Sequence, residues 1–361
     1  MKKKVWLLGV AVAAFTSCAE SEVLDIPESR VIAFDSHVQK NTRAVTQIQQ
    51  PGLAANDLNK FWVMGHATVG SEEPVNLFNG EELCSYTGTG YTYQNIKTWA
   101  LNTTYDFAAY SNGNKQITSG LTHTLNVNDN GSSLNIRGYS VGEDDLLAAL
   151  VTPFTINEEG SNIPQTVGLP FVHLLSCVRI TITNSSSEFY LKISDIQFNA
   201  IGTDDCTYSV DDAGNKNIVW GNTASDAQAA AATEKQYTFK APRKGNSTDI
   251  DYIAPGEVFQ DICFFIPQSN AKEITINVES YEYKKLNEED TELTYVKRAT
   301  DRYSASLAIP APHDIWQPGY QYNYAAEIAG SMHYIRFSAT VDNWTPQEQG
   351  MGATKETSTN P

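Results

Sequence analysis

The chain has 361 residues and a formal net charge of −17 at pH 7, which argues against binding to nucleic acid and against a basic membrane-binding face. Its length is sufficient for two domains. The 18 Tyr, 14 Phe and 6 Trp residues, together with frequent Thr, Asn and Gly, favour β-structure with many turns.

The N-terminus carries the pattern of an exported lipoprotein. Lysines at positions 2–4 precede the apolar residues 5–15, a segment too short for a bilayer span of about 20 residues but typical of a signal peptide. Thr16 and Ser17 precede Cys18, and a small residue before cysteine lets lipoprotein signal peptidase cleave once the thiol carries its diacyl lipid. We therefore predict a signal peptide over residues 1–17 and a palmitate-type lipid on Cys18. An ordinary signal peptide with an incidental cysteine is the alternative.

The first half of the chain then reads as a series of strands. Residues 31–38 alternate between apolar and polar side chains, which predicts a strand with Ile32, Phe34 and Val38 on one face. The following residues 39–43 are polar and open to proteases. Further strands are expected at residues 61–69, 91–96 and 104–111, whereas residues 144–150 fit either a helical turn or the start of a strand.

The second half continues in the same way after a break at residues 158–165 that is rich in turn-forming side chains. The Ala-rich residues 226–235 fit a short helix or a mobile loop. Long helical periodicity is absent, so we predict an all-β fold of two predominantly antiparallel β-sandwich domains, residues 44–165 and 166–345, with a flexible tail over 346–361. The strands expected in the second half are residues 169–183, 190–202, 261–267, 273–283, 292–299, 320–328 and 334–341.

The two ends of the chain carry the same strand pattern. Residues 32–38 and residues 335–341 both read I-x-F-x-x-x-V with a small residue in the centre. Because alternate side chains of a strand share a face, either segment can fill the same row of pockets. The apolar positions are Ile32, Phe34 and Val38 in the first copy and Ile335, Phe337, Ala339 and Val341 in the second.

This repetition suggests a mechanism of assembly. A cut between Arg43 and Ala44 removes residues 18–43, including the first copy, and leaves a groove unpaired. The second copy, residues 334–342 of a neighbouring subunit, can then add to the groove as a strand. Such a contact is head to tail and builds a fibre. The alternative is that two amphipathic strands are alike by chance.

The chain resembles the fimbrillin, or type V pilin, family of Gram-negative anaerobes. The resemblance rests on an ordered set of segments, at residues 16–18, 30–38, 40–44, 61–65, 169–182 and 334–345. It implies transthyretin-like domains and an outer-membrane lipoprotein precursor. It further implies cleavage by an Arg-specific or trypsin-like protease and donor-strand exchange with other subunits into an extracellular adhesive fimbrium. The mature fimbrium would meet a host receptor or a partner bacterium, with a stalk subunit favoured over a tip or anchor subunit.

The sequence predicts no enzyme, no cofactor and no metal site. The six histidines include no HExxH motif, and His173 lies in an apolar segment as a core residue would. Disulfides and buried free thiols are both open for the remaining cysteines. A surface glycan-binding lipoprotein, with exposed aromatic side chains, is the alternative function. The cysteines are Cys84, Cys177, Cys206 and Cys263, and the aromatic candidates are Tyr91, Tyr93 and Trp99.

Overall fold

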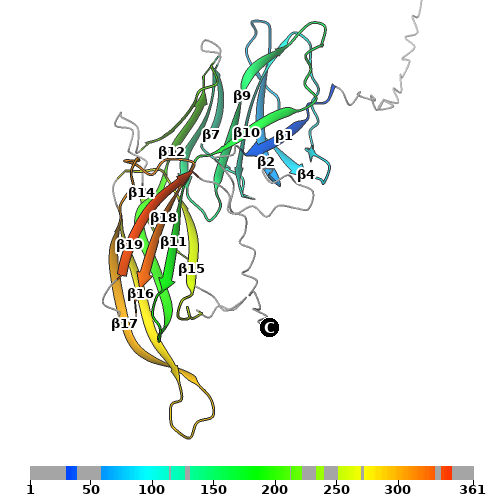
Figure 1. The fold of residues 1–361 in the computed structure, drawn as a ribbon. Coiled ribbons are helices and arrows are strands. Elements are labelled where there is room, and N and C mark those ends of the chain that lie inside the picture. Colours follow the sequence, from blue (N-terminus) through cyan, green and yellow to red (C-terminus); the bar gives the residue numbers. More distant parts are fainter. Residues whose placement is uncertain are drawn as a thin grey trace, which may run out of the picture.

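A computed structural model describes most of the chain (Figure 1), and its described residues form nineteen β-strands. The all-β fold class is therefore confirmed. No helix in this part of the chain combines the length and the apolarity that crossing a bilayer requires. The described residues are 30–38, 58–113, 115–126, 131–211, 213–221, 233–239, 251–269, 272–329 and 335–343.

The strands follow one another closely along the chain. In the first half they are β1 (Phe34–Val38), β2 (Lys60–Val69), β3 (Val75–Asn76), β4 (Glu82–Tyr86), β5 (Tyr91–Thr92), β6 (Thr103–Asn112), β7 (Leu121–Asn126), β8 (Gly131–Ser140) and β9 (Leu146–Ile156). In the second half they are β10 (Val167–His173), β11 (Ser176–Asn184), β12 (Tyr190–Val210), β13 (Lys216–Trp220), β14 (Thr233–Thr238), β15 (Val258–Phe265), β16 (Lys272–Lys284), β17 (Thr294–Leu307), β18 (Tyr320–Ile328) and β19 (Ile335–Asn343).

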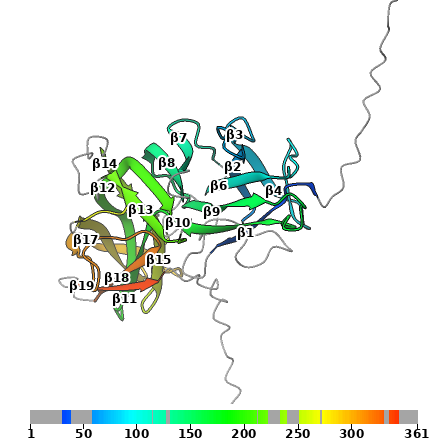
Figure 2. The same cartoon turned by 90° about the horizontal axis from the view of Figure 1, so that it is seen from above.

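These strands make three sheets among the described residues. An eight-stranded sheet has the order β1-β10-β9-β6-β2-β4-β5, with β3 paired to β2. A seven-stranded sheet has the order β17-β16-β12-β8-β7, with β13 and β14 both paired to β12, and a four-stranded sheet has the order β15-β11-β18-β19. Figures 1 and 2 show the eight-stranded sheet as one lobe and the four-stranded sheet beside the seven-stranded sheet in the other.

The first and second halves of the chain do not form separate sheets. Residues 158–165 connect β9 to β10, which are antiparallel neighbours in one sheet. Strands β7 and β8 precede this connection but belong to the sheet of the second half, where β8 pairs with β12. The division into domains at residue 165 stays a prediction.

Strands β2, β6 and β9 are buried on both faces, so their side chains supply two separate cores. In β6, Tyr105 and Phe107 belong to a core on one face of the eight-stranded sheet. Their neighbours Ala108 and Tyr110 belong to the core between this sheet and the others. Because alternate residues of a strand point to opposite faces, a nearly continuous apolar run is what a doubly covered strand requires.

Residues 144–150 illustrate the same rule. Their run of leucine and alanine fitted a helical turn or the start of a strand, and the structure places it in β9. Leu147 and Ala149 enter one core, whereas Leu146, Ala148 and Leu150 enter the other. Of the Ala-rich segment, residues 226–232 lie outside the described residues, and the part from Thr233 onward begins strand β14.

Gly65 on β2 lies so close to the ring of Phe107 that no side chain fits there. A Cβ atom at this position would lie 2.8 Å from Cδ1 of Phe107. We expect Gly65→Ala to lower the free energy of unfolding by about 1–3 kcal/mol, because the ring is held in a packed core. Urea denaturation followed by tryptophan fluorescence measures this change.

Gly90→Ala is the matched control for Gly65→Ala. A Cβ atom at Gly90 meets nothing within 4 Å, and the residue lacks a positive φ. The control should unfold at the wild-type urea concentration. Equal midpoints for both variants would contradict the close packing of β2 on Phe107.

Candidate functional site

Strand β1 lies at the edge of the eight-stranded sheet and seals one of its two cores. It runs parallel to β10, with Phe34 opposite Val167 and Val38 opposite Phe171. Its side chains alternate between buried and exposed. Ile32, Phe34 and Val38 are at most 3% exposed. The three residues predicted for the removable strand therefore face the core; whether the strand is removable stays a prediction.

Phe34 is the central apolar contact of β1. Its ring centroid lies 5.3 Å from that of Phe107, 5.7 Å from that of Tyr93 and 6.3 Å from that of Phe78. Tilted and edge-on ring pairs at these separations add to the stabilisation that comes from apolar burial. Phe34 thus occupies a pocket whose walls are aromatic.

Polar contacts fix the register of β1 in this groove. The Tyr93 hydroxyl donates a hydrogen bond of 2.7 Å to the carbonyl oxygen of Ile32. The buried Ser36 hydroxyl contacts the Tyr91 hydroxyl and accepts a 3.3 Å hydrogen bond from the backbone N–H of Leu58. A shift of β1 by one residue would bury Asp35 and His37 in place of Phe34 and Ser36, so the register is strongly specified.

The residues predicted for lipidation and cleavage cannot be placed in the fold. Cys18, Arg43 and Ala44 fall outside the described residues, which resume at Leu58 after Val38.

The predicted donor segment forms strand β19 at the edge of a different sheet. It pairs antiparallel with β18, from Ile328 opposite Ile335 to Tyr320 opposite Asn343. The backbone of Ile335 and Phe337 is part of this strand. Ala339 is exposed, whereas Val341 is half-buried against the core between the sheets. The structure therefore places β1 and β19 at separate sheet edges (Figure 1).

The aromatic side chains that are candidates for sugar binding pack in the core beneath β1 or beside it. Tyr93 and Trp99 are 8% and 5% exposed, and both belong to the core beneath β1. Tyr91 packs on Phe61 with ring centroids 4.8 Å apart. One observation behind the glycan-binding alternative is therefore removed.

The four described cysteines are free thiols, which decides between the two states left open by the sequence. Burial raises the pKa of each thiol, in the case of Cys263 to about 12. Such thiols stay protonated and poorly nucleophilic at neutral pH.

His173 is a core residue, as its apolar segment predicted. It is 1% exposed and contacts the carboxylate of Asp145, which the sequence did not single out. Burial raises the pKa of Asp145, although the His173 imidazole acts in the opposite direction.

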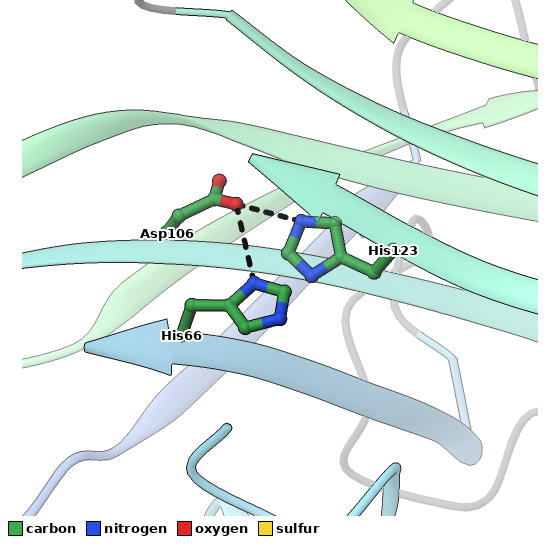
Figure 3. A group of neighbouring side chains, drawn as sticks. All are labelled: His66, Asp106 and His123. Atoms are coloured by element: carbon green, nitrogen blue, oxygen red, sulfur yellow. Dashed lines mark ion pairs between the residues drawn. The ribbon is translucent and has the colours of Figure 1, made fainter. Parts of the chain in front are cut away.

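No pattern in the sequence indicates the second histidine cluster. His66, Asp106 and His123 converge from strands β2, β6 and β7, as Figure 3 shows. Burial acts to raise the pKa of Asp106, but His123 and His66 outweigh it and hold that pKa below its ordinary value. The three residues are far apart in sequence and form no motif. Only the register of β2 on β6 and the docking of β7 bring them together.

Comparison with known proteins gives the family context. The profile of the fimbrillin-like family matches residues 42–344. A fimbrial protein from Bacteroides vulgatus is 14% identical with a TM-score of 0.51, and the match covers 88% of this chain and 100% of that one. At that identity the match establishes a shared fold. No curated protein sequence matches the chain.

Two further solved structures are similar at lower scores. A proposed cell adhesion protein from Bacteroides uniformis is 14% identical with a TM-score of 0.44, over 88% of this chain and 100% of that one. The fimbrial anchor protein Mfa2 from Porphyromonas gingivalis is 8% identical with a TM-score of 0.32, over 87% of this chain and 98% of that one.

The contacts of Phe34 give a test of how β1 is held. We expect Phe34→Ala to destabilise the packing of β1 by about 3–5 kcal/mol, because the aromatic pocket is left empty. The amide protons of β1 and β10 should then exchange with deuterium much faster, as mass spectrometry of peptides can measure. His37→Ala, at an exposed position of the same strand, is the control and should keep wild-type protection. Unchanged exchange in Phe34→Ala would contradict the central role of this ring.

Proposed function

The chain belongs to the fimbrillin-like family, and we propose that it is a structural subunit of an adhesive surface fimbrium that polymerises by donor-strand exchange. In this proposal the precursor is exported as a lipoprotein through Cys18 and cleaved between Arg43 and Ala44. Its partners are other fimbrial subunits and an Arg-specific or trypsin-like protease.

The observation that carries the proposal is the position of β1. It is an edge strand whose apolar face fills a groove, and it lies directly before the polar segment at residues 39–43. An edge strand has one neighbour in its sheet, so it can leave without breaking the hydrogen bonds between the remaining strands. Residues 18–43 then leave together with the lipid, which makes the lipid a device for export rather than a permanent anchor.

Loss of β1 creates the driving force for assembly. The emptied groove exposes a row of large apolar side chains that Ile32, Phe34 and Val38 cover in the precursor. Burying each such side chain again is favourable by roughly 1.5–3 kcal/mol. A strand of the same pattern therefore binds tightly. The groove residues are Leu58, Phe61, Phe78, Tyr93, Phe107, Val167, Leu169 and Phe171.

Strand β19 supplies that pattern. In the proposed exchange, Ile335, Phe337 and Val341 take the places of Ile32, Phe34 and Val38, and Ala339 takes the place of Ser36. Among the described strands β19 pairs with β18 alone, and this edge position supports its release from its own subunit. Donor and groove are different surfaces, so each contact leaves one free donor and one free groove and the chain of subunits grows. A subunit with both surfaces fits a stalk better than a tip or an anchor.

Cleavage at Arg43 is the first step to test. We expect Arg43→Gln to abolish the ladder of polymers that unboiled mature protein gives on a denaturing gel, because β1 still fills the groove. N-terminal sequencing should find Ala44 as the first residue of wild-type surface material.

Lys40→Gln, three residues earlier in the same polar segment, is the control and should polymerise normally. Ladders from Arg43→Gln at the wild-type level would refute the proposed cut. A mature N-terminus at an acylated Cys18 would instead favour an anchor subunit or the glycan-binding alternative.

The difference between Ser36 and Ala339 gives a test of the register of exchange. In the precursor, the Ser36 hydroxyl accepts a hydrogen bond from the Leu58 N–H and contacts the Tyr91 hydroxyl. Ala339→Ser should restore this contact in the polymer, which is worth about 0.5–1.5 kcal/mol, and so slow the dissociation of subunits about two- to tenfold. Thr340→Ser, on the other face of the strand, is the control. Equal dissociation rates for both variants in heated samples would rule out this register.

A further inference from the structure

We propose that His66, Asp106 and His123 form a binding site for a divalent transition metal of the zinc type, which joins strands β2 and β6 to strand β7. This site lies on the face of the eight-stranded sheet opposite the groove of β1. It is independent of the proposed exchange of strands.

The register of β2 on β6 places two of the three ligands side by side. His66 on β2 is directly opposite Asp106 on β6, so both side chains project from the same face of the sheet. That face also carries Met64 and Ala108 of the core between the sheets. His123 comes from β7, the edge strand of the seven-stranded sheet. The cluster therefore bridges two sheets.

A β-bulge lies beside the site. Tyr105 pairs with Phe154 and Phe107 pairs with Val151, so two residues of β9 stand opposite Asp106 alone. One of these two is Pro153, which has no N–H to donate. Bulges re-aim side chains and are frequent next to functional sites. The irregularity thus falls at the position of the central ligand.

The ligand atoms lie near the spacing that a metal requires. His123 Nε2 lies 2.7 Å and His66 Nδ1 lies 3.8 Å from Asp106 Oδ2, and all three ligand atoms are within 4.8 Å of one another. A tetrahedral ion with bonds of about 2.0–2.2 Å separates its ligands by about 3.3 Å. The two distances from Asp106 Oδ2 differ from that value by about 0.5 Å, so we expect small side-chain movements to place an ion between the three atoms.

The cluster is also poorly satisfied without an ion. The side chains of Asp106 and His123 are 0% and 2% exposed, yet neither carboxylate oxygen of Asp106 accepts a hydrogen bond of good geometry. The rings of His66 and His123 are only 4.7 Å apart, so two protonated imidazoles would repel each other. A bound cation compensates the charge of the carboxylate, and each neutral imidazole donates a nitrogen lone pair to the ion.

The surroundings leave room for a further ligand and a route of entry. His66 and His123 line a pocket of about 510 Å³, together with Asn76, Glu81 and Thr122. The His66 side chain is 17% exposed, so solvent reaches the cluster from this side. Three protein ligands with an open position suit zinc and similar ions. Two imidazoles disfavour calcium and magnesium, which prefer oxygen ligands throughout.

The experiment uses the purified full chain freed of metal by chelation. Zn²⁺ should raise the melting temperature by a few degrees, because the ion binds the folded chain and not the unfolded one. Co²⁺ should give visible absorption bands without a charge-transfer band from thiolate. A thiolate band would assign the ion to cysteine and overturn the proposal.

Matched variants locate the ion. Asp106→Asn and His123→Gln should each weaken Zn²⁺ binding by at least about tenfold in calorimetry, since even the loss of an outer-shell partner has that effect. His66→Gln, at the half-buried rim of the pocket, serves if either buried variant fails to fold. His37→Gln, at an exposed position, should bind as the wild type does.

Two results would overturn the proposal. One is the absence of any shift in melting temperature with Zn²⁺ or Co²⁺, which indicates a metal-free cluster of hydrogen-bonded histidines. The other is wild-type affinity in all ligand variants, which indicates an adventitious ion only. Neither readout depends on cleavage or polymerisation, so failure here leaves the proposed fimbrial function intact.

Discussion

The burial of β2, β6 and β9 on both faces is the constraint on which the rest of the structure depends. A strand in this position sends alternate side chains into two different cores. Phe107 enters the core under β1, and Ala108 enters the core against the other sheets. The eight-stranded sheet therefore needs a cover on each side. The seven-stranded sheet covers one face. On the other face β1, the edge strand of the sheet itself, packs Phe34 across the core onto Phe107 of β6.

This arrangement separates two tasks within one sheet. The odd-numbered residues of β6 face the aromatic pocket that Phe34 fills. Burial of apolar side chains there favours a strand with the alternating pattern of residues 32–38. The even-numbered face holds Asp106, where the second sheet delivers His123. A cation there would fasten β7 to the sheet that offers the groove. The lobe that carries the groove would then be stabilised on the face of the sheet away from β1.

Much of the fold was predictable because amphipathic strands carry a period of two. The strands at residues 61–69, 104–111, 273–283 and 320–328 were identified nearly to their ends. Residues 91–96 are less well predicted, since only Tyr91–Thr92 form a strand there. Tyr93, the next residue, packs its ring in the core beneath β1. Residues 144–150 were ambiguous because burial on both faces erases the alternation that distinguishes a strand.

The sequence by itself determined the all-β class, the family resemblance, the apolar face of residues 32–38 and its repetition at residues 335–341. These features are local, because each depends on the order of side chains within one segment. The tertiary structure alone decided that Asp145 contacts His173, that the four described cysteines are free thiols, and that His66, Asp106 and His123 meet. Such contacts arise from strand register and from the packing of separate sheets. Residues far apart in the chain then become neighbours without leaving a pattern in the sequence.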